Sequence, residues 1–498
     1  MLPCGKKKGL LILKYLRKIC TVFIAAVLLL SAAGVMGNAQ LNGFEVTTTE
    51  TVSEENVMQP VIADEEMPQI VLDENTVYVS QATVPDNDTE EDPVETKAAA
   101  VSAVNPDPYV SSHYHVTDFD EIFFDEMFPS YLAGATSWDP MGMDDNGIIY
   151  FGYTCDRTDL GLEDFAVFSY NPEINTVKFL GSFIDASQAA GNYVSGESIP
   201  KGHTKFYCID NKMYMASQSF HDFKEGIGDL YRYRGAHLYC YDIEKQVLLD
   251  LSASMPDGVW CEHEGVVAMN YMEETGMLVG FTHPHANLVF YDLAAGTVGR
   301  FVTGIPWTLG NPLSREIIIV GDKVYLYRGV ETTGNGAQTQ YPVYVYDYSD
   351  DVLSLTGYTM MGGFWNGQDT TDDDKTTYIS GCAGYLYKLD RETGTFTFLC
   401  DMDAAITNTG SYFYSITLSP DESKLFYIPT ATQTGMLIEY DIATNTICKI
   451  ASPTRGVYCG SAIRSGDWYY FTRFGTAGNG YSWNYTPSVV RYKIEPQN

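Results

Sequence analysis

Residues 288–301 read Leu288-Val289-Phe290-Tyr291-Asp292-Leu293-Ala294-Ala295-Gly296-Thr297-Val298-Gly299-Arg300-Phe301. Two strand-like runs flank a turn that opens at Asp292 and closes at Gly296. An aspartate side chain can accept a hydrogen bond from the backbone just ahead of it, and glycine tolerates a left-handed backbone. The stretch therefore predicts a β-hairpin.

The same turn recurs along the chain. It reads Tyr170-Asn171 with Asn175-Thr176, Tyr241-Asp242 with Gln246, Tyr346-Asp347 with Asp351, Leu389-Asp390 with Gly394-Thr395, and Tyr440-Asp441 with Asn445-Thr446. A seventh start, Tyr492-Lys493, comes six residues before the end. Successive starts are 71, 50, 55, 43, 51 and 52 residues apart, which is the period of a four-stranded repeat.

Each interval also holds an earlier pair of strand-like runs. These are 205–209 with 213–217, 266–271 with 277–281, and 316–320 with 324–328. The aromatic content of 13% favours strands over helices. Four antiparallel strands in each of seven repeats predict an all-β chain that forms a seven-bladed β-propeller over residues 107–498.

One repeat carries a family resemblance. The run Leu418-Ser419-Pro420-Asp421-Glu422-Ser423-Lys424-Leu425-Phe426-Tyr427 resembles the blade signature of TolB-like and YVTN-type propellers, which are WD40-like repeat folds. The resemblance covers one blade in seven and implies the fold rather than an activity.

The last repeat is incomplete. After the strand at 489–494 only four residues remain, too few for an outer strand. An unpaired strand edge would leave the ring open. We therefore expect an N-terminal strand between about Asp107 and Phe119 to close the last blade.

The N-terminal residues predict export. A basic stretch from Lys6 to Lys18 precedes an apolar run from Ile19 to Met36, and Gly37-Asn38-Ala39 suits a signal peptidase. Residues 1–39 are predicted to be a signal peptide of a secreted or extracytoplasmic protein, and an uncleaved membrane anchor is the alternative. Residues 40–106 are acidic and lack periodicity, which predicts a disordered linker.

Charge and cysteine content narrow the function classes. The formal net charge is −34, so the surface repels nucleic acid and anionic membranes. Eight cysteines follow residue 39, each within an apolar strand pattern, and buried thiols are the expected state.

Histidines gather on one face of the predicted ring. In a four-stranded meander, the connections from second to third strand and from blade to blade emerge on the same face, here called the top face. Six of the eight histidines map there in blades two and three: His203, His221, His237, His263, His283 and His285. We expect His203, His237, His263 and at least one of His283 and His285 to share a pocket near the axis. His283-Pro284-His285 also suits one divalent metal ion, although the spacing is not specific.

Other candidate ligand-binding side chains belong to the same face. The long loop of blade two carries Tyr231, Arg232, Tyr233 and Arg234, and further candidates are Trp260, Trp307, Arg315 and Arg328. Tryptophan rings suit stacking on sugars, and the alternative for each is a gap filler between blades. For the arginines the alternative is a surface ion pair.

Two functions are compatible with these residues. A secreted propeller with a His/Tyr/Arg site is similar in architecture to the propeller polysaccharide lyases that cleave oligogalacturonate or ulvan by β-elimination. The chemistry would then use His203 or His263 as base, Tyr231 or Tyr233 as acid, and Arg234 or a metal at His283 and His285 to hold the carboxylate, with His221, His237 and Arg232 in the binding site. The alternative is a non-catalytic extracellular module that binds a carbohydrate or a protein.

Overall fold

The computed structural model describes residues 114–124, 137, 140–219, 233–306, 314–327, 340–361, 367–381, 384–401, 413–429, 434–455, 462–473 and 487–497. The chain divides into two compact units, Met1–Lys97 and Ala98–Asn498. All described residues belong to the second unit. Among them, no helix is both long and apolar enough to cross a membrane.

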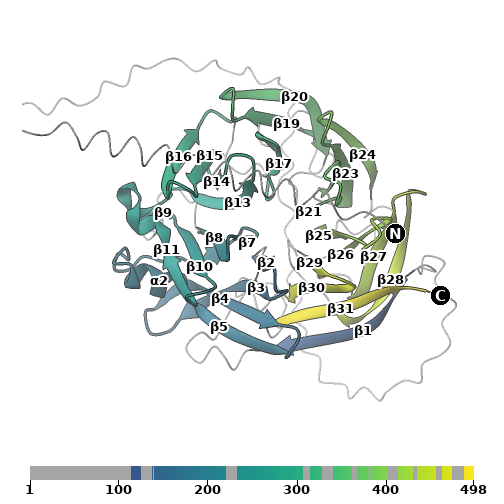
Figure 1. Ribbon diagram of the computed structural model, residues 1–498, viewed down its shortest axis with the longest axis horizontal. Helices are drawn as coiled ribbons and strands as arrows, with labels where there is room; N and C mark the ends of the chain where they lie inside the picture. The colour runs from purple at the N-terminus through teal and green to yellow at the C-terminus, as the bar shows by residue number, and fades with distance from the viewer. Residues whose placement is uncertain are drawn as a thin grey trace, which may run out of the picture. The chain divides into compact units, whose positions relative to one another are not determined.

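The second unit is a ring of seven antiparallel blades, as Figure 1 shows. Blade one contains β2 (Met141–Met143), β3 (Ile149–Arg157), β4 (Leu162–Asn171) and β5 (Thr176–Ser182). Blade two contains β6 (Lys201–Gly202), β7 (Tyr207–Ile209), β8 (Lys212–Gln218), β10 (Leu238–Asp242) and β11 (Val247–Asp250). Blade three contains β13 (Gly265–Met272), β14 (Met277–His283), β15 (Leu288–Asp292) and β16 (Thr297–Val302).

The other four blades complete the ring. Blade four contains β17 (Ile318–Val320), β18 (Lys323–Tyr327), β19 (Gln340–Asp347) and β20 (Val352–Met361), and blade five contains β21 (Gly367–Thr370), β22 (Thr376–Ser380), β23 (Tyr385–Asp390) and β24 (Thr395–Asp401). Blade six contains β25 (Phe413–Leu418), β26 (Lys424–Pro429), β27 (Thr434–Asp441) and β28 (Thr446–Arg455). Blade seven contains β29 (Ile463–Ser465), β30 (Trp468–Arg473), β31 (Ser488–Pro496) and β1 (Tyr114–Phe123). The predicted all-β, seven-bladed fold is confirmed.

The recurring hairpin has the predicted turn chemistry. Asp292 Oδ1 accepts hydrogen bonds from the backbone N–H groups of Ala294 and Ala295, at 2.9 and 2.8 Å. Gly296 closes the turn with a φ of +66°. The closing residues of the other five complete turns also have positive φ: Asn175, Gln246, Asp351, Gly394 and Asn445. The local sequence therefore determines where each third strand turns into the fourth.

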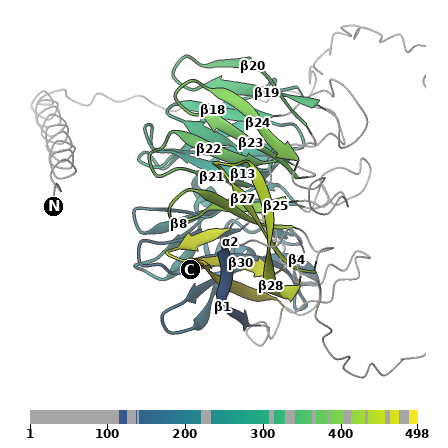
Figure 2. The same cartoon turned by 90° about the vertical axis from the view of Figure 1, so that its right-hand side faces the viewer.

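Hydrophobic side chains fill the space between neighbouring blades. Blades two and three pack through a cluster that includes Leu238 and Val266, and blades three and four through one that includes Phe290 and Leu326. Equivalent clusters join every other pair of adjacent blades, including blade seven to blade one. Figure 2 shows the blades from the side. Apolar burial between faces of adjacent sheets is thus continuous around the ring.

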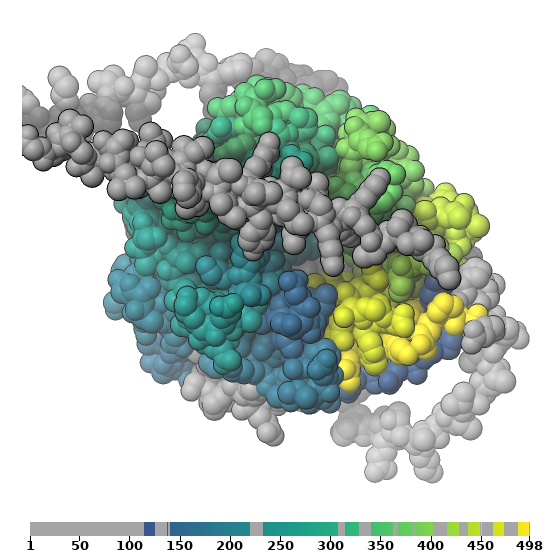
Figure 3. Space-filling view, in the orientation of Figure 1, coloured from purple at the N-terminus to yellow at the C-terminus, as the bar shows by residue number. Residues whose placement is uncertain are grey.

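The N-terminal strand closes the last blade, as predicted. β1 pairs antiparallel with β31, in a register that runs from Tyr114 opposite Pro496 to Phe123 opposite Ser488. The two strands lie side by side at the rim in Figures 1 and 3. Tyr114 is buried and packs edge-on against Phe426 of blade six, with ring centroids 5.2 Å apart. The closing strand therefore joins two blades.

Blade two departs from the regular pattern. Its inner strand was expected over 205–209, but it is split into β6 and β7 by residues 203–206. Helix α2 (Phe183–Ala189) precedes it, and the short helices η3 (Leu251–Ser254) and η4 (Pro256–Gly258) follow it. β9 (Gly235–Ala236) and β12 (Cys261–Glu262) form a separate two-stranded sheet, and β9 contacts both β8 and β13.

The cysteines of the described residues are free thiols. Cys155, Cys240 and Cys261 are buried, while Cys208, Cys400 and Cys448 are half-buried. Burial raises the pKa of Cys240 to about 12. Such thiols remain protonated and behave as small apolar side chains.

We predict that Gly296→Ala lowers the free energy of unfolding by about 1–2 kcal/mol, because alanine pays the steric cost of a left-handed backbone. Its Cβ would meet only the Tyr291 hydroxyl at 3.9 Å, so crowding contributes little. Urea denaturation measures the difference. Gly299→Ala, on the following strand at an ordinary φ, is the control and should change stability by less than about 0.5 kcal/mol; equal effects of the two substitutions would contradict the turn assignment.

We also predict that a chain beginning at residue 124, which lacks β1, has a melting temperature lower by about 10 °C or more, because blade seven loses its outer strand. A chain beginning at Ala98 keeps β1 and is the matched control. Differential scanning calorimetry compares the two. Identical transitions would show that β1 does not hold the ring closed.

Candidate functional site

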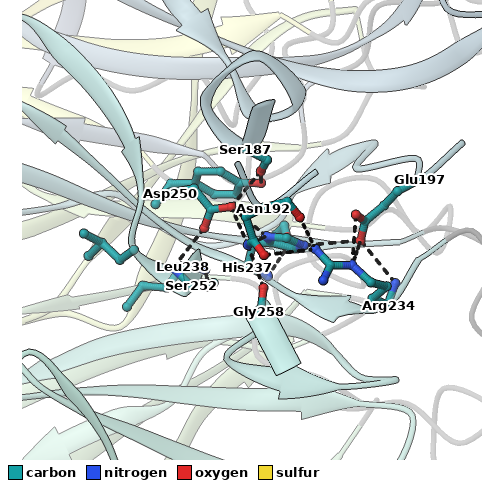
Figure 4. A network of polar contacts seen from close by, with 12 residues as sticks. Ser187, Asn192, Glu197, Arg234, His237, Leu238, Asp250, Ser252 and Gly258 are labelled. Atoms are coloured by element: carbon teal, nitrogen blue, oxygen red, sulfur yellow. Dashed lines mark hydrogen bonds and ion pairs between the residues drawn. The ribbon is translucent and has the colours of Figure 1, made fainter. Parts of the chain in front are cut away.

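The top-face connections of blades two and three hold the best-defined cluster of charged groups in the described part of the chain. Its residues come from the α2–β6 connection, from the segment before β10, and from the end of β11. Figure 4 shows this network. These segments are distant in sequence and meet because blade two packs on the connection from blade one.

His237 lies at the centre of the network and is fully buried. Its Nδ1 lies 3.0 Å from Asp250 Oδ2, and its Nε2 lies 3.3 Å from Glu197 Oε1. Ser187 Oγ and Asn192 Nδ2 also donate to Asp250 Oδ2, at 2.7 and 2.9 Å. Ionised carboxylates only accept hydrogen bonds, so both ring nitrogens donate and the ring is an imidazolium.

The pKa shifts agree with this charge state. Burial lowers the pKa of His237, but hydrogen bonds and the negative charges of Asp250 and Glu197 outweigh burial and raise it above 6.5. Burial raises the pKa of each carboxyl group, and the bonds and charge of His237 outweigh it, so both carboxyl pKa values are lowered. The three groups form a buried, ionised triad.

Arg234 and Tyr233, two predicted site residues, are anchored in the same region. Arg234 Nε donates to both carboxylate oxygens of Glu197 at 3.1 Å, and its Nη2 donates to the Asn192 carbonyl oxygen at 2.6 Å. Tyr233 is buried, and its hydroxyl lies 3.0 Å from Ser217 Oγ. Both side chains are therefore held by hydrogen bonds to other groups of this protein.

Residues 203–206 reach from blade two to four other blades. His203 Nδ1 lies 3.3 Å from the Val267 carbonyl oxygen of blade three. Lys205 Nζ is 3.0 Å from Glu316 Oε1 before blade four and 3.3 Å from the Gln368 carbonyl oxygen of blade five. The Phe206 backbone N–H donates to Met141 in blade one at 2.9 Å. His203 and Lys205 thus tie strand ends across the ring.

Two further predicted histidines belong to Glu–His pairs of blade three. His263 Nε2 lies 3.4 Å from Glu262 Oε1, and both side chains are more than 60% exposed. His285 Nδ1 contacts Glu264 Oε1, whose side chain is only 4% exposed. His203, His237 and His285 therefore have three separate sets of partners.

The remaining predicted residues divide by location. Trp260 is buried between blades two and three, where its Nε1 donates to the Phe290 carbonyl oxygen at 3.5 Å, so it packs as a gap filler. His283 ends β14 opposite Gly265, and Arg315 is half-buried before Glu316. Outside the described residues lie His221, Tyr231, Arg232, Trp307 and Arg328.

The described residues offer no ready-made metal site. Nowhere among them are three or more His, Cys, Asp or Glu side chains arranged to hold an ion. At His285, Nδ1 already contacts Glu264. The metal suggested by His283-Pro284-His285 therefore lacks a donor set in this part of the chain.

Sequence reasoning missed the carboxylates that bind these histidines and Lys205: Glu197, Asp250, Glu264 and Glu316. In a chain with 64 acidic residues, a single carboxylate carries no signal of its own. The position of a carboxylate within the repeat does carry a signal, because Glu264 and Glu316 both come just before the inner strand of their blade. Superposing the repeats would have placed both at the top-face ends of inner strands.

No family model matches the chain, and no curated protein matches it. Similar solved structures include a chain of "Crystal Structure of Mitotic Checkpoint Complex", with 9% identity, 81% of this chain and 98% of that chain covered, and a TM-score of 0.46. "Structure of U3-55K" has 9% identity, coverage of 76% and 99%, and a TM-score of 0.48. "Crystal structure of RRP9 WD40 repeats" has 8% identity, coverage of 77% and 99%, and a TM-score of 0.48.

We predict that His237→Gln destabilises the fold by about 3 kcal/mol near pH 6, because it leaves the buried Asp250 carboxylate without its counter-charge and leaves Glu197 with Arg234 alone. The raised pKa of His237 means that its contribution is complete below the unfolded-state value of about 6.5 and is lost as pH rises through the folded-state value. The difference in the free energy of unfolding between wild type and variant should therefore become smaller as the pH rises toward about 9. Urea denaturation across this range measures it, and a gap independent of pH would contradict a charged His237.

Proposed function

We propose that this chain is an exported, non-catalytic recognition module whose ring binds a protein or peptide ligand that carries positive charge. The observation that carries the proposal is the state of Arg234. This cation was the expected clamp for a substrate carboxylate, and its guanidinium is bound to Glu197 inside the protein. A group held this way is a structural counter-ion.

The expected acid–base residues give the same support. Tyr233, a candidate acid, is buried against Ser217, and His203, a candidate base, is 2% exposed beside the Val267 carbonyl. A general acid or base has to reach the proton that it transfers. A lyase mechanism that used Tyr233 as acid and His203 as base would therefore require these side chains to leave their present partners.

Charge favours a cationic ligand over an anionic polysaccharide. Lysines and arginines of the described residues commonly form ion pairs with carboxylates, as do Arg157, Lys205, Arg234, Lys245, Arg300, Lys323, Lys375, Arg391, Lys424, Arg491 and Lys493. Because these cations are neutralised locally, the acidic excess dominates the field that a ligand meets. Such a field attracts cationic partners and repels uronate chains.

The proposal predicts selective binding without turnover. A chain beginning at Gln40, the first residue after the predicted signal peptide, should bind a lysine- and arginine-rich peptide, and the binding should weaken as salt rises because the attraction is electrostatic. Isothermal titration calorimetry measures the affinity. A glutamate-rich peptide of equal length is the matched control and should not bind.

The same preparation decides between the two function classes. Incubated with polygalacturonate or ulvan, with and without divalent metal ions, it should release no unsaturated uronate product in an absorbance assay. If the wild-type chain forms this product and the His263→Ala variant does not, the protein is a lyase and the proposal of a non-catalytic recognition module is wrong.

A further inference from the structure

Blade seven places an arginine and a tyrosine side by side near the axis of the ring. Arg464 belongs to β29, the innermost strand of the blade, and Tyr469 belongs to the neighbouring strand β30. Figure 1 shows β29 on the axial side of β30. The two residues are opposite each other in the antiparallel register, so their side chains lie on the same face of the sheet.

Arg464 differs from most of the described arginines. Ion pairs with carboxylates hold Arg157, Arg234, Arg300, Arg391 and Arg491. Within the part of the chain that the structure describes, Arg464 forms neither an ion pair nor a hydrogen bond, and the residue is half-buried. A guanidinium that is partly removed from water favours a negatively charged partner.

Tyr469 has a buried hydroxyl without a hydrogen bond. The residue is fully buried in the apolar cluster between blades six and seven, and its ring packs edge-on against Phe426 with centroids 5.4 Å apart. Among the described residues its hydroxyl has no hydrogen-bond partner. By contrast, the Tyr440 hydroxyl, also of a fully buried residue, donates to Asn445 Oδ1 at 2.7 Å. A buried hydroxyl without a bond costs free energy, so a ligand that supplies an acceptor is favoured.

The surrounding charges determine which acceptor suits the pair. Burial raises the pKa of Tyr469, so its hydroxyl keeps the proton and can donate. Arg464 acts on this hydroxyl more strongly than the nearby carboxylates of Asp467 and Asp369 do. These carboxylates would repel an anion of high charge. A carboxylate carries one negative charge and has two oxygens, one for each donor.

We propose that Arg464 and Tyr469 form a binding site for a single carboxylate group, at the axial end of the interface between blades six and seven. One carboxylate oxygen accepts a hydrogen bond from the guanidinium, and the other accepts one from the hydroxyl. The carboxylate belongs to a small organic acid or to the C-terminus of a peptide, which present the same chemistry. The site is separate from the top face of blades two and three and does not depend on the recognition function.

Three small probes test the site in the chain that begins at Gln40. Acetate represents a small acid, N-acetylglycine represents a peptide C-terminus, and N-acetylglycinamide is the uncharged control. Isothermal titration calorimetry at constant ionic strength gives each Kd. Both carboxylates should bind and the amide should not. Equal binding of the two carboxylates assigns the site to small acids, and tighter binding of N-acetylglycine assigns it to a peptide terminus.

Substitutions locate the binding. Arg464→Gln should weaken carboxylate binding about tenfold, because it removes a charge-assisted hydrogen bond. Arg391→Gln is the matched control: it removes the same charge from a guanidinium that already pairs with Asp374 at 2.8 Å, and it should change the Kd less than about twofold. Tyr469→Phe keeps the buried ring and should weaken binding about threefold, since one neutral donor is lost.

Tyr469→Phe also separates a ligand donor from a structural hydroxyl. Without carboxylate, the substitution should leave the melting temperature unchanged or raise it, because no hydrogen bond is lost. Tyr440→Phe removes a bonded hydroxyl and should lower the melting temperature. Equal losses for the two variants would show that water or another group already satisfies the Tyr469 hydroxyl, and would overturn the proposal.

The remaining outcomes also decide the proposal. If neither carboxylate binds, or if Arg464→Gln leaves their binding unchanged, the site is overturned and the recognition function is unaffected. Equal binding of N-acetylglycinamide and N-acetylglycine would overturn the assignment to a carboxylate. Binding of a basic peptide that fails while carboxylates bind through Arg464 would overturn the recognition function and leave this site standing.

Discussion

The pairing of β1 with β31 is the constraint on which the rest of the structure depends. Each blade is stabilised by apolar contact with the blades on either side, so a ring with one unpaired edge would lose contact at both ends of the gap. The chain closes the gap with residues from opposite ends of the described unit, Tyr114–Phe123 and Ser488–Pro496. Closure brings the connections of all blades to defined positions on the top face.

Inside this ring, blade two has an unusual concentration of buried charge. Ionised His237, Glu197 and Asp250 are costly to remove from water, and they are tolerated because each has charged or hydrogen-bonding partners. Lys205 with Glu316 adds a further pair, between blade two and the start of blade four. These contacts connect blades through side chains as well as through apolar packing.

The parts of the fold that could be predicted from sequence are those set by local chemistry. Asp292 and Gly296 specify a turn through a bond to the backbone and a positive φ, so the repeat and the strand order follow from residues close in sequence. The missing outer strand was predicted because a strand edge must be paired. The split of the inner strand of blade two could not be predicted, since Lys205 bonds to partners more than 100 residues away.

Side-chain roles were harder to predict for the same reason. The clustering of histidines in blades two and three is visible in the sequence, but whether an imidazole is buried or exposed depends on carboxylates from other segments. His237 meets Glu197, which is 40 residues away, and becomes part of the interior. Trp260 looks like a stacking platform in sequence and packs between two blades in the structure. His285 combines a buried carboxylate partner with a half-exposed ring.

The central claim is that the top face of blades two and three receives a cationic ligand. Hydrogen–deuterium exchange of the chain with and without an arginine-rich peptide measures this most directly, because every backbone N–H reports its own protection. The account predicts that peptide slows exchange in the top-face connections of blades two and three, and leaves the turns at Asp292–Gly296 and Asp390–Gly394 unchanged. Protection confined to those turns, or no protection anywhere while the peptide is bound, would contradict it.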